Sequence, residues 1–357
     1  MKKNKSKKNK FFSFVFSCFG CVILAFLACF LAFRLSLAAP DSKASAKQVR
    51  LEIPSGVSIS KIGEILVDNG LIRSDRAFYI AARFPFLSFR KTVPVMKSGY
   101  YNVNSSMGAL EIMDLLESGL QDYTRVVIPE GLTVRKIASI LENNEICQAG
   151  DFVAAACDAA LLEKYSIPAE TFEGFLFPDT YFFAPGMKAG DVLEIMVESF
   201  FDKVSGIPYY SGKSPASFYE TLVLASIIER EYRVADEAPL IASVFRNRIE
   251  AGAGLYSCAT IEYIITEIQG KPHPDLITYD DLKIDSPYNT YKWAALPPTP
   301  ISNPGLVALR AAAEPAKTDY FYFTLTDSSA GKHTFSKSFN AHVKAGTQFK
   351  TKKSGSN

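Results

Sequence analysis

Two glutamates at the end of an apolar run are the residues of this chain best suited to acid chemistry. Residues 221–228 contain no charged side chain and offer no polar face, which predicts a helix buried in a core. The run continues into Glu229 and Glu231. Counting back four and seven residues from Glu229 gives Ala225 and Leu222, so its side chain projects along the buried stripe. A carboxyl held there loses hydration, which raises its pKa and suits a general acid acting on a glycosidic oxygen.

The same pattern has a structural interpretation, in which a buried Glu229 forms an ion pair with Arg246 or Arg248. Spacing does not separate the two glutamates either, because Glu231 also lies over apolar residues one turn back. Other chemistry has less support. The sequence contains no Gly-x-Ser-x-Gly elbow, phosphate loop or dinucleotide fingerprint, and Cys258 is better explained as a small core thiol than as a nucleophile. We therefore take Glu229 as the candidate acid.

The elements that must position these residues begin with an internal repeat. Residues 51–69 reappear, in related form, as residues 126–144. The residues of the first copy with identical counterparts are Ile53, Pro54, Gly56, Lys61, Ile62, Ile65, Leu66 and Asn69. Each copy predicts a short strand ended by proline, a glycine turn and an amphipathic helix capped by Ser58 or Thr133. Two related αβ units are expected, at about residues 49–120 and 126–200.

The second copy carries an additional aromatic segment, residues 172–181, which includes Glu173, a glycine and a Pro-Asp turn. Two interpretations are open on composition alone. The rings either line a groove for a sugar, whose pyranose faces stack on aromatic rings, or they pack in the core.

Residues 216–345 have a different, mixed pattern. Helices are predicted at about 218–233, 237–251 and 306–313. Residues 286–305 contain five prolines together with aromatic residues, which is typical of an ordered binding loop rather than a solvated linker. Alternation after Asp319 predicts a strand, and His333 follows a glycine turn. His333 either contacts substrate or makes a structural hydrogen bond at a strand end.

The N-terminus predicts the compartment. Residues 2–10 carry six lysines and no acid, and residues 11–33 are 23 residues without a charge. That length spans a bilayer as one helix, and the lysines are expected on the cytoplasmic side, which places the rest of the chain outside the cytoplasmic membrane. The alternative is a cleaved signal peptide, because small residues near 37–39 and 44–46 resemble cleavage sites.

Charge and cysteine content exclude several classes. Without the six N-terminal lysines, 33 basic residues face 37 acidic ones, so the exported part has no basic excess that would predict nucleic-acid binding. Three of the six cysteines lie in the apolar segment, which leaves Cys147, Cys157 and Cys258. Three thiols form at most one disulfide and do not make a disulfide scaffold. With three histidines and no close Cys/His spacing, no metal site is predicted.

Several motifs in one order resemble a known family. They are Ala-Ser-Ile-Ile-Glu-Arg-Glu at 225–231, Ala-Ser-Val-Phe-Arg-Asn-Arg at 242–248, Tyr-Asn-Thr-Tyr at 288–291, Leu-Pro-Pro at 296–298, His-Thr-Phe at 333–335, Glu-Gly at 173–174, Phe-Pro-Asp-Thr at 177–180 and Ile-Pro-Glu-Gly at 128–131. Together they are similar to the endolytic murein transglycosylase family (MltG, YceG-like), over about residues 49 to 345.

The resemblance implies an α+β fold with a single N-terminal transmembrane helix, a LysM-like αβ subdomain and a mixed αβ catalytic domain. The parts expected are a cytoplasmic basic tail (1–10), the transmembrane helix (11–33), a linker (34–48), the LysM-like subdomain (49–125), the YceG-like catalytic domain (126–345) and a disordered tail (346–357). The expected partners are peptidoglycan glycan strands, membrane-bound peptidoglycan synthases and the inner membrane, with neither cofactor nor nucleic acid.

The implied reaction cleaves nascent glycan after N-acetylmuramic acid and leaves a 1,6-anhydro end, which terminates strand elongation. The muramic acid's own 6-hydroxyl is the nucleophile, so one carboxyl suffices where ordinary glycosidases need two, about 5 to 9.5 Å apart. The resemblance places the acid on Glu229. The residues it places as substrate contacts are Tyr288, Asn289 and Tyr291, with Glu173, Glu237 and His333 as further candidates.

The sequence departs from the family pattern around this predicted site. Ser257-Cys258-Ala259-Thr260 stands where Ser-Asp-Pro-Thr is usual, Tyr232 stands where Thr is common, and Trp293 and Ala295 replace an aliphatic residue and a glycine. These changes bear on substrate preference more than on the reaction. The alternative function is a non-catalytic anchor that binds the wall or docks synthases, and such an anchor needs no desolvated acid.

Overall fold

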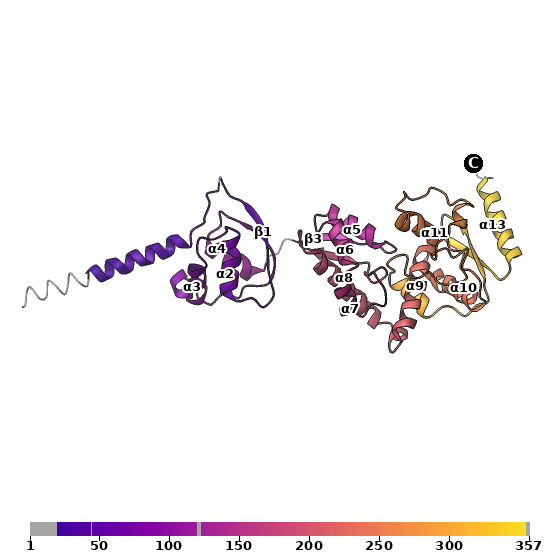
Figure 1. The fold of residues 1–357 in the computed structure, drawn as a ribbon, viewed down its shortest axis with the longest axis horizontal. Helices are drawn as coiled ribbons and strands as arrows, with labels where there is room; N and C mark the ends of the chain where they lie inside the picture. The colour runs from indigo at the N-terminus through magenta and orange to yellow at the C-terminus, as the bar shows by residue number, and fades with distance from the viewer. Residues whose placement is uncertain (1–19, 44, 120–122, 355–357) are drawn as a thin grey trace, which may run out of the picture. The chain divides into compact units, whose positions relative to one another are not determined.

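A computed structural model describes residues 20–43, 45–119 and 123–354. The chain divides into two compact units, and the division falls between Tyr123 and Thr124 (Figure 1). Each unit has its own hydrophobic core, and we describe each by itself. The elements are a mixture of helices and short antiparallel strand pairs, as expected for an α+β protein.

The first unit begins with a helix at residues 20–36, followed by a small αβ fold. Its elements are β1 (Gln48–Ile53), α2 (Ile59–Asp68), α3 (Asp75–Arg83), the 3-10 helix η1 (Pro85–Ser88), β2 (Gly99–Asn104) and α4 (Ala109–Ser118). Strands β1 and β2 pair antiparallel, with Gln48 opposite Asn104 and Ile53 opposite Gly99. The last turns of the leading helix join this core, because Phe33 and Leu37 pack against it.

The membrane span predicted at residues 11–33 lies partly outside the described residues. Within the described part of the chain, the structure contains no helix that is both long enough and apolar enough to cross a membrane.

The second unit opens with the second copy of the repeat. Its elements are β3 (Thr124–Val127), α5 (Val134–Asn143), α6 (Ala149–Ala155), α7 (Ala159–Lys164), β4 (Thr180–Phe183) and α8 (Ala189–Ser205). Strands β3 and β4 pair antiparallel, as β1 and β2 do in the first unit. The predicted caps are confirmed in both copies: the Ser58 hydroxyl accepts from the Lys61 N–H at 3.2 Å, and the Thr133 hydroxyl accepts from the Lys136 N–H at 3.4 Å.

The remaining elements surround the buried helix that carries the two glutamates. They are η2 (Pro208–Tyr210), α9 (Pro215–Glu231), η3 (Ala235–Glu237), α10 (Ala238–Glu250), α11 (Cys258–Tyr263), the π-helix η4 (Ile264–Ile268), η5 (Asp281–Lys283), α12 (Leu306–Ala313), β5 (Tyr322–Asp327), β6 (Lys332–Ser336) and α13 (Phe339–Ser354). All eight residues of α9 from Thr221 to Ile228 are buried, as the absence of a polar face predicted.

Of the two interpretations of the aromatic segment at residues 172–181, packing in the core is the one that the structure has, because Phe172 and Phe175 are at most 1% exposed. The tail predicted to be disordered from residue 346 is helical through Ser354, because it continues α13. The helix carries its polar pattern into the tail, which is why composition alone suggested disorder.

Candidate active site

Glu229 lies in the last turn of α9, and its carboxylate is held by two protein donors. Oε2 accepts from the Gly305 N–H at 2.9 Å, and Oε1 accepts from the Tyr232 hydroxyl at 3.1 Å. Gly305 is the N-cap residue of α12, so the carboxylate sits at a helix N-terminus. Burial raises the pKa of Glu229 to about 7 and outweighs these two donors, which lower it, while nearby Glu130 raises it further. The raised pKa predicted from the sequence is therefore present.

Glu231, two residues later, faces a different environment. Its side chain lines a cavity of about 630 Å³. The Ser257 hydroxyl donates to Oε1 at 2.5 Å. Burial raises the pKa of Glu231, whereas Ser257 and the nearby His333 lower it. Glu229 is absent from the lining of this cavity.

The rest of the cavity wall is aromatic and basic. Its polar and aromatic lining includes Arg248, Tyr256, Cys258, Tyr291, Tyr322 and His333. Among the described residues that line it, Glu231 is the one carboxylic acid. Such a wall offers flat faces for stacking on a sugar ring and donors for its hydroxyl groups.

Arg248 is fixed in the wall by the backbone. Its Nε donates to the Phe321 carbonyl at 2.7 Å and its Nη1 donates to the Leu255 carbonyl at 2.5 Å. Its guanidinium also lies over the rings of Tyr256 and Tyr322, 5.5 and 5.4 Å from their centroids. The sequence left open an ion pair between Glu229 and Arg246 or Arg248. In the structure, Arg248 instead binds two backbone carbonyls, and Glu229 accepts from Gly305 and Tyr232.

His333 and Glu237 act as a pair. The Glu237 carboxylate contacts Nδ1 of His333 at 2.7 Å and accepts from the His333 backbone N–H at 3.1 Å. A carboxylate at Nδ1 favours the tautomer with the proton on that nitrogen, which leaves Nε2 as the ring nitrogen available to other groups. Glu237, predicted as a substrate contact, therefore orients His333, while His333 lines the cavity.

Tyr291 and Cys258 meet on another part of the wall. The Tyr291 hydroxyl lies 3.0 Å from the Cys258 Sγ, and its ring makes an edge contact with Tyr256 at 5.6 Å between centroids. Burial raises the pKa of the Cys258 thiol, so it is neutral near pH 7 and a poor nucleophile. Tyr291 is thus a predicted contact residue that does reach the cavity with Glu231.

Asn289 and Tyr288, the other predicted contacts on this loop, do not line the cavity. Asn289 is fully buried, and its amide donates to the Leu282 and Ile284 carbonyls at 3.0 and 2.7 Å. Its Oδ1 accepts from the Tyr291 N–H at 2.9 Å, so Asn289 shapes the loop that presents Tyr291. The Tyr288 hydroxyl lies 2.8 Å from the Thr299 hydroxyl, and its ring packs on Tyr263.

Glu173 is also placed away from the cavity. It is 5% exposed, and both carboxylate oxygens accept from the Val134 N–H at the start of α5, at 3.2 and 3.1 Å. The Asn303 amide donates to Oε1 at 2.9 Å. Burial raises the pKa of Glu173 to about 8, although these donors lower it. Glu173 is a structural carboxyl that ties α5 to the loop before α12.

Sequence reasoning missed several residues of the site: Tyr256, Tyr322 and His342 line the cavity, and Ser257 donates to Glu231. His342 comes from α13, just before the predicted tail at 346–357, and its ring stacks on Tyr322 with 5.4 Å between centroids. Tyr256 has a positive φ of 52°, which is uncommon for a non-glycine residue. One signal in the sequence pointed to Ser257: it is the first residue of the segment 257–260, which departs from the family pattern.

Some of the residues that depart from the family pattern line the cavity or contact Glu229, and others lie outside it. Cys258 lines the cavity, and Tyr232 donates to Glu229. Trp293 lies outside the cavity: the residue is 51% exposed, and its Nε1 donates to the Ser286 carbonyl at 3.1 Å. The substitution at Trp293 therefore changes a neighbouring surface rather than the cavity.

A buried carboxyl of raised pKa, facing an aromatic and basic cavity, defines an acid–base site for a polar substrate. Comparison with known proteins gives the family. The model of the YceG-like family matches residues 51–348, and the chain belongs to this family.

Relatives of the chain carry informative names. It is 32% identical over 326 residues to the endolytic murein transglycosylase of Bacillus subtilis strain 168, and the match covers 87% of each chain. It is 30% identical over 325 residues to the protein of the same name from Streptococcus pneumoniae serotype 2, covering 82% of this chain and 57% of that one. A crystal structure of a putative YceG-like protein from Listeria monocytogenes superposes with a TM-score of 0.55 at 31% identity, covering 84% of this chain and 99% of that one.

Proposed function

We propose that this protein is an endolytic murein transglycosylase, a lytic enzyme that cuts within peptidoglycan glycan strands. The observation that carries the proposal is a single carboxyl, Glu231, in a cavity lined by aromatic and basic side chains. The names of the relatives from Bacillus subtilis and Streptococcus pneumoniae support it.

The lone carboxyl favours a lytic reaction over hydrolysis. Hydrolases use a second carboxyl, about 5 to 9.5 Å from the first, as nucleophile or as base for water. In the proposed reaction the 6-hydroxyl of N-acetylmuramic acid attacks its own anomeric carbon, and the bond to the leaving sugar breaks. The acid first protonates the leaving oxygen and then accepts the proton of the 6-hydroxyl, which returns it to its starting state. The product end is 1,6-anhydro-muramic acid.

The geometry favours Glu231 as this acid over Glu229, the residue predicted from the sequence. Glu231 faces the cavity and keeps one carboxylate oxygen clear of the Ser257 hydrogen bond. Glu229 has both oxygens engaged, by Gly305 and by Tyr232. Glu229 is the second candidate, since burial raises its pKa to about 7, a value that suits a general acid.

Around the acid, His333 and Tyr291 supply polar contacts to the sugar. His333, held by Glu237, offers Nε2, and Arg248 supplies positive charge on the same wall. A fixed cation and an oriented imidazole bind hydroxyl, acetamido or carboxylate groups of the glycan without rearrangement, so the site is organised before the substrate arrives.

The test compares Glu231→Gln with Glu229→Gln in the full chain, each incubated with un-crosslinked glycan strands. We expect Glu231→Gln to reduce the rate about 10²- to 10⁴-fold, the usual contribution of a general acid, and Glu229→Gln to reduce it much less. Mass spectrometry would detect chain ends lighter by one water, and thermal unfolding would check that each variant is folded.

Each of the other possible results supports a different conclusion about the acid or the function. Loss of cutting with Glu229→Gln alone moves the acid to Glu229. Reducing ends in place of anhydro ends make the protein a hydrolase. If the wild-type chain binds glycan and does not cut it, the protein is a non-catalytic wall anchor.

The setting of the enzyme is also proposed. The lysine-rich start and the uncharged residues 11–33 support a single transmembrane helix with a cytoplasmic N-terminus and the two units outside the inner membrane. We divide the exported part into a LysM-like subdomain at 49–125 and a catalytic domain at 126–345. In this setting the enzyme would release nascent strands beside membrane-bound synthases, and protease protection of residues 49–345 in intact spheroplasts would contradict the orientation.

A further inference from the structure

The first unit presents an unusual group of exposed rings, which we call the aromatic loop (residues 84–89). Phe84, Phe86 and Phe89 are 47, 69 and 78% exposed. Phe84 and Phe86 contact each other edge to face, with centroids 6.3 Å apart. Single exposed apolar residues are ordinary on a soluble protein, whereas several large rings together mark a surface that contacts another apolar phase.

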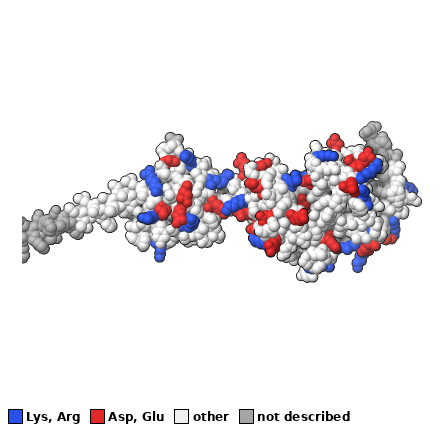
Figure 2. Space-filling view, in the orientation of Figure 1, with Lys and Arg blue, Asp and Glu red and all other residues white. Residues whose placement is uncertain are grey.

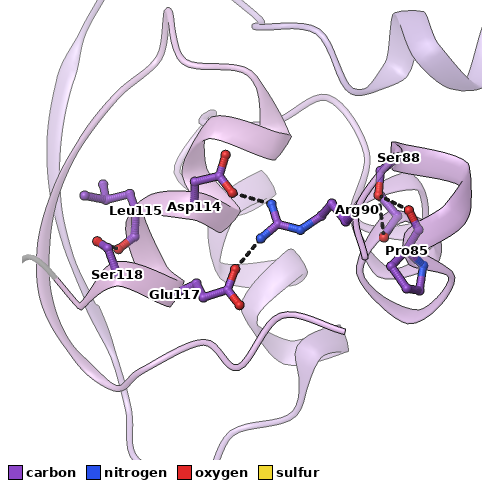
Figure 3. A network of polar contacts seen from close by, with 8 residues as sticks. Pro85, Ser88, Arg90, Asp114, Leu115, Glu117 and Ser118 are labelled. Atoms are coloured by element: carbon purple, nitrogen blue, oxygen red, sulfur yellow. Dashed lines mark hydrogen bonds and ion pairs between the residues drawn. The ribbon is translucent and has the colours of Figure 1, made fainter. Parts of the chain in front are cut away.

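Polar contacts within the loop and from the adjacent Arg90 to α4 hold the backbone that carries these rings (Figure 3). The Arg90 N–H donates to the Pro85 carbonyl at 2.9 Å, and the Ser88 hydroxyl bonds the Pro85 carbonyl at 3.1 Å. The Arg90 guanidinium pairs with both Asp114 and Glu117 of α4, which ties the loop to the core of the unit. A fixed scaffold lowers the entropic cost of seating the rings in a partner phase.

The aromatic loop touches the helix at residues 20–36. The Arg34 guanidinium lies over the Phe89 ring, 5.5 Å from its centroid. That helix exposes apolar side chains along its length, among them Leu24, Phe26 and Leu31 at 67, 73 and 61% exposure. In Figure 2 it carries no red or blue side chain before it meets the folded unit.

We propose that the aromatic loop seats in the headgroup region of the lipid bilayer, beside the point where the N-terminal helix leaves the membrane. The inference rests on the proposed membrane anchoring. The apolar phase that covers the exposed face of the helix must reach its last turns, where Arg34 meets Phe89. Aromatic rings flanked by cations are the chemistry of such interfaces, and Arg34, Arg83 and Lys91 supply the cations.

A lipid surface accounts for these features better than a protein partner does. A partner would have to cover both the loop and an apolar helix that carries no charge from residue 20 to residue 33. A bilayer covers both at once. The consequence for the enzyme is that the first unit is fixed against the membrane by two points, the helix and the loop, instead of swinging on one.

The test uses the fact that the chain has one tryptophan, Trp293. In the full chain, Phe86→Trp is combined with Trp293→Phe, and the protein is reconstituted into phosphatidylethanolamine and phosphatidylglycerol vesicles. The lipids carry bromine atoms on their acyl chains, at positions close to the headgroups. These bromine atoms quench the fluorescence of an indole that lies in the membrane interface. The wild-type chain, whose indole at position 293 belongs to the second unit, is the matched control.

We expect at least twofold stronger quenching of the indole introduced at position 86 than of Trp293. Quenching at position 86 no stronger than at Trp293 overturns the proposal, as does a blue-shifted emission without quenching, which would indicate a protein contact. Flotation of the chain with vesicles tests the membrane anchoring separately from the position of the aromatic loop. A chain that floats without quenching at position 86 refutes the loop alone, and one that does not float refutes the anchoring. Cutting of soluble glycan reports on the proposed function independently.

Discussion

The two copies of the repeat share their local structure and differ in their surroundings. Gly56 and Gly131 close the same turn with φ of 75° and 74°, and Ser58 and Thr133 cap the helices that follow. A side chain added at Gly56 would meet no atom within 4 Å, whereas one at Gly131 would lie 3.4 Å from Cδ of Arg230. The turn at Gly56 has open space around it, whereas the turn at Gly131 packs beside Glu229 and Arg230.

The helix starts differ in the same way. The Ser58 cap of α2 is exposed, but the start of α5 is buried against Glu173, whose carboxylate accepts from the Val134 N–H. Glu173 in turn accepts from Asn303, which lies just before α12. Similar sequence thus gives the same strand, turn and helix twice, and later parts of the chain then decide whether the unit stands alone or supports a site.

The largest effect is expected where the second copy is locked to the rest of its unit. Gly174 has φ of 91°, and a Cβ there would lie 2.6 Å from Cγ of Pro300. Gly174→Ala should therefore destabilise the second unit by about 2–5 kcal/mol, from the left-handed backbone and the overpacking together. Gly56→Ala, with open space around it, should cost the first unit only about 1–2 kcal/mol.

Urea unfolding followed by near-ultraviolet circular dichroism would measure both glycine variants. Equal losses would mean that the second copy is no more tightly held than the first, and the contrast between the two would then be wrong.

The sequence predicted the local features of this contrast well. Apolar patterning predicted α9 and its burial, the repeat predicted both strand–turn–helix units, and Leu306–Ala313 forms the third helix as expected. These features depend on residues within a turn or two of each other. The class of chemistry followed as well, because a carboxyl at the end of a buried helix loses hydration wherever the rest of the chain lies.

The identity of the acid could not be decided in the same way. Glu229 meets Gly305, 76 residues later, and Glu231 meets Ser257, 26 residues later. No local spacing records which of these partners closes around which carboxyl. The surroundings of Asn289 could not be predicted for a related reason: its motif marks a loop, and only the folded loop shows that its amide donates to the Leu282 and Ile284 carbonyls.

The buried carboxyl of the second copy, which the first copy lacks, gives a pH-dependent prediction. Burial raises the pKa of Glu173 from an ordinary 4.5 to about 8, so the folded state keeps a proton that the unfolded state releases. The resulting stability is fully present below about pH 4.5 and is lost as pH rises through 8. We expect the difference in unfolding free energy between wild type and Glu173→Gln to shift against wild type over that range.

Thermal unfolding of both proteins at a series of pH values would measure this difference. Glu229 and Glu231 also have raised pKa values, and comparison with the single variant cancels their contribution. A difference that stays constant between pH 5 and pH 8 would show that Glu173 is ionised throughout.

The smallest effect concerns the two helix caps, which are matched by the repeat. Ser58→Ala and Thr133→Ala each remove a hydroxyl that accepts from the third helical N–H, at a cost of about 1 kcal/mol. Hydrogen exchange resolved by peptide should then show roughly fivefold faster exchange in α2 for the first variant and in α5 for the second. Because each unit has its own core, neither change should reach the other helix. Faster exchange of α2 in Thr133→Ala would mean that the two copies of the repeat unfold together and are not independent in stability.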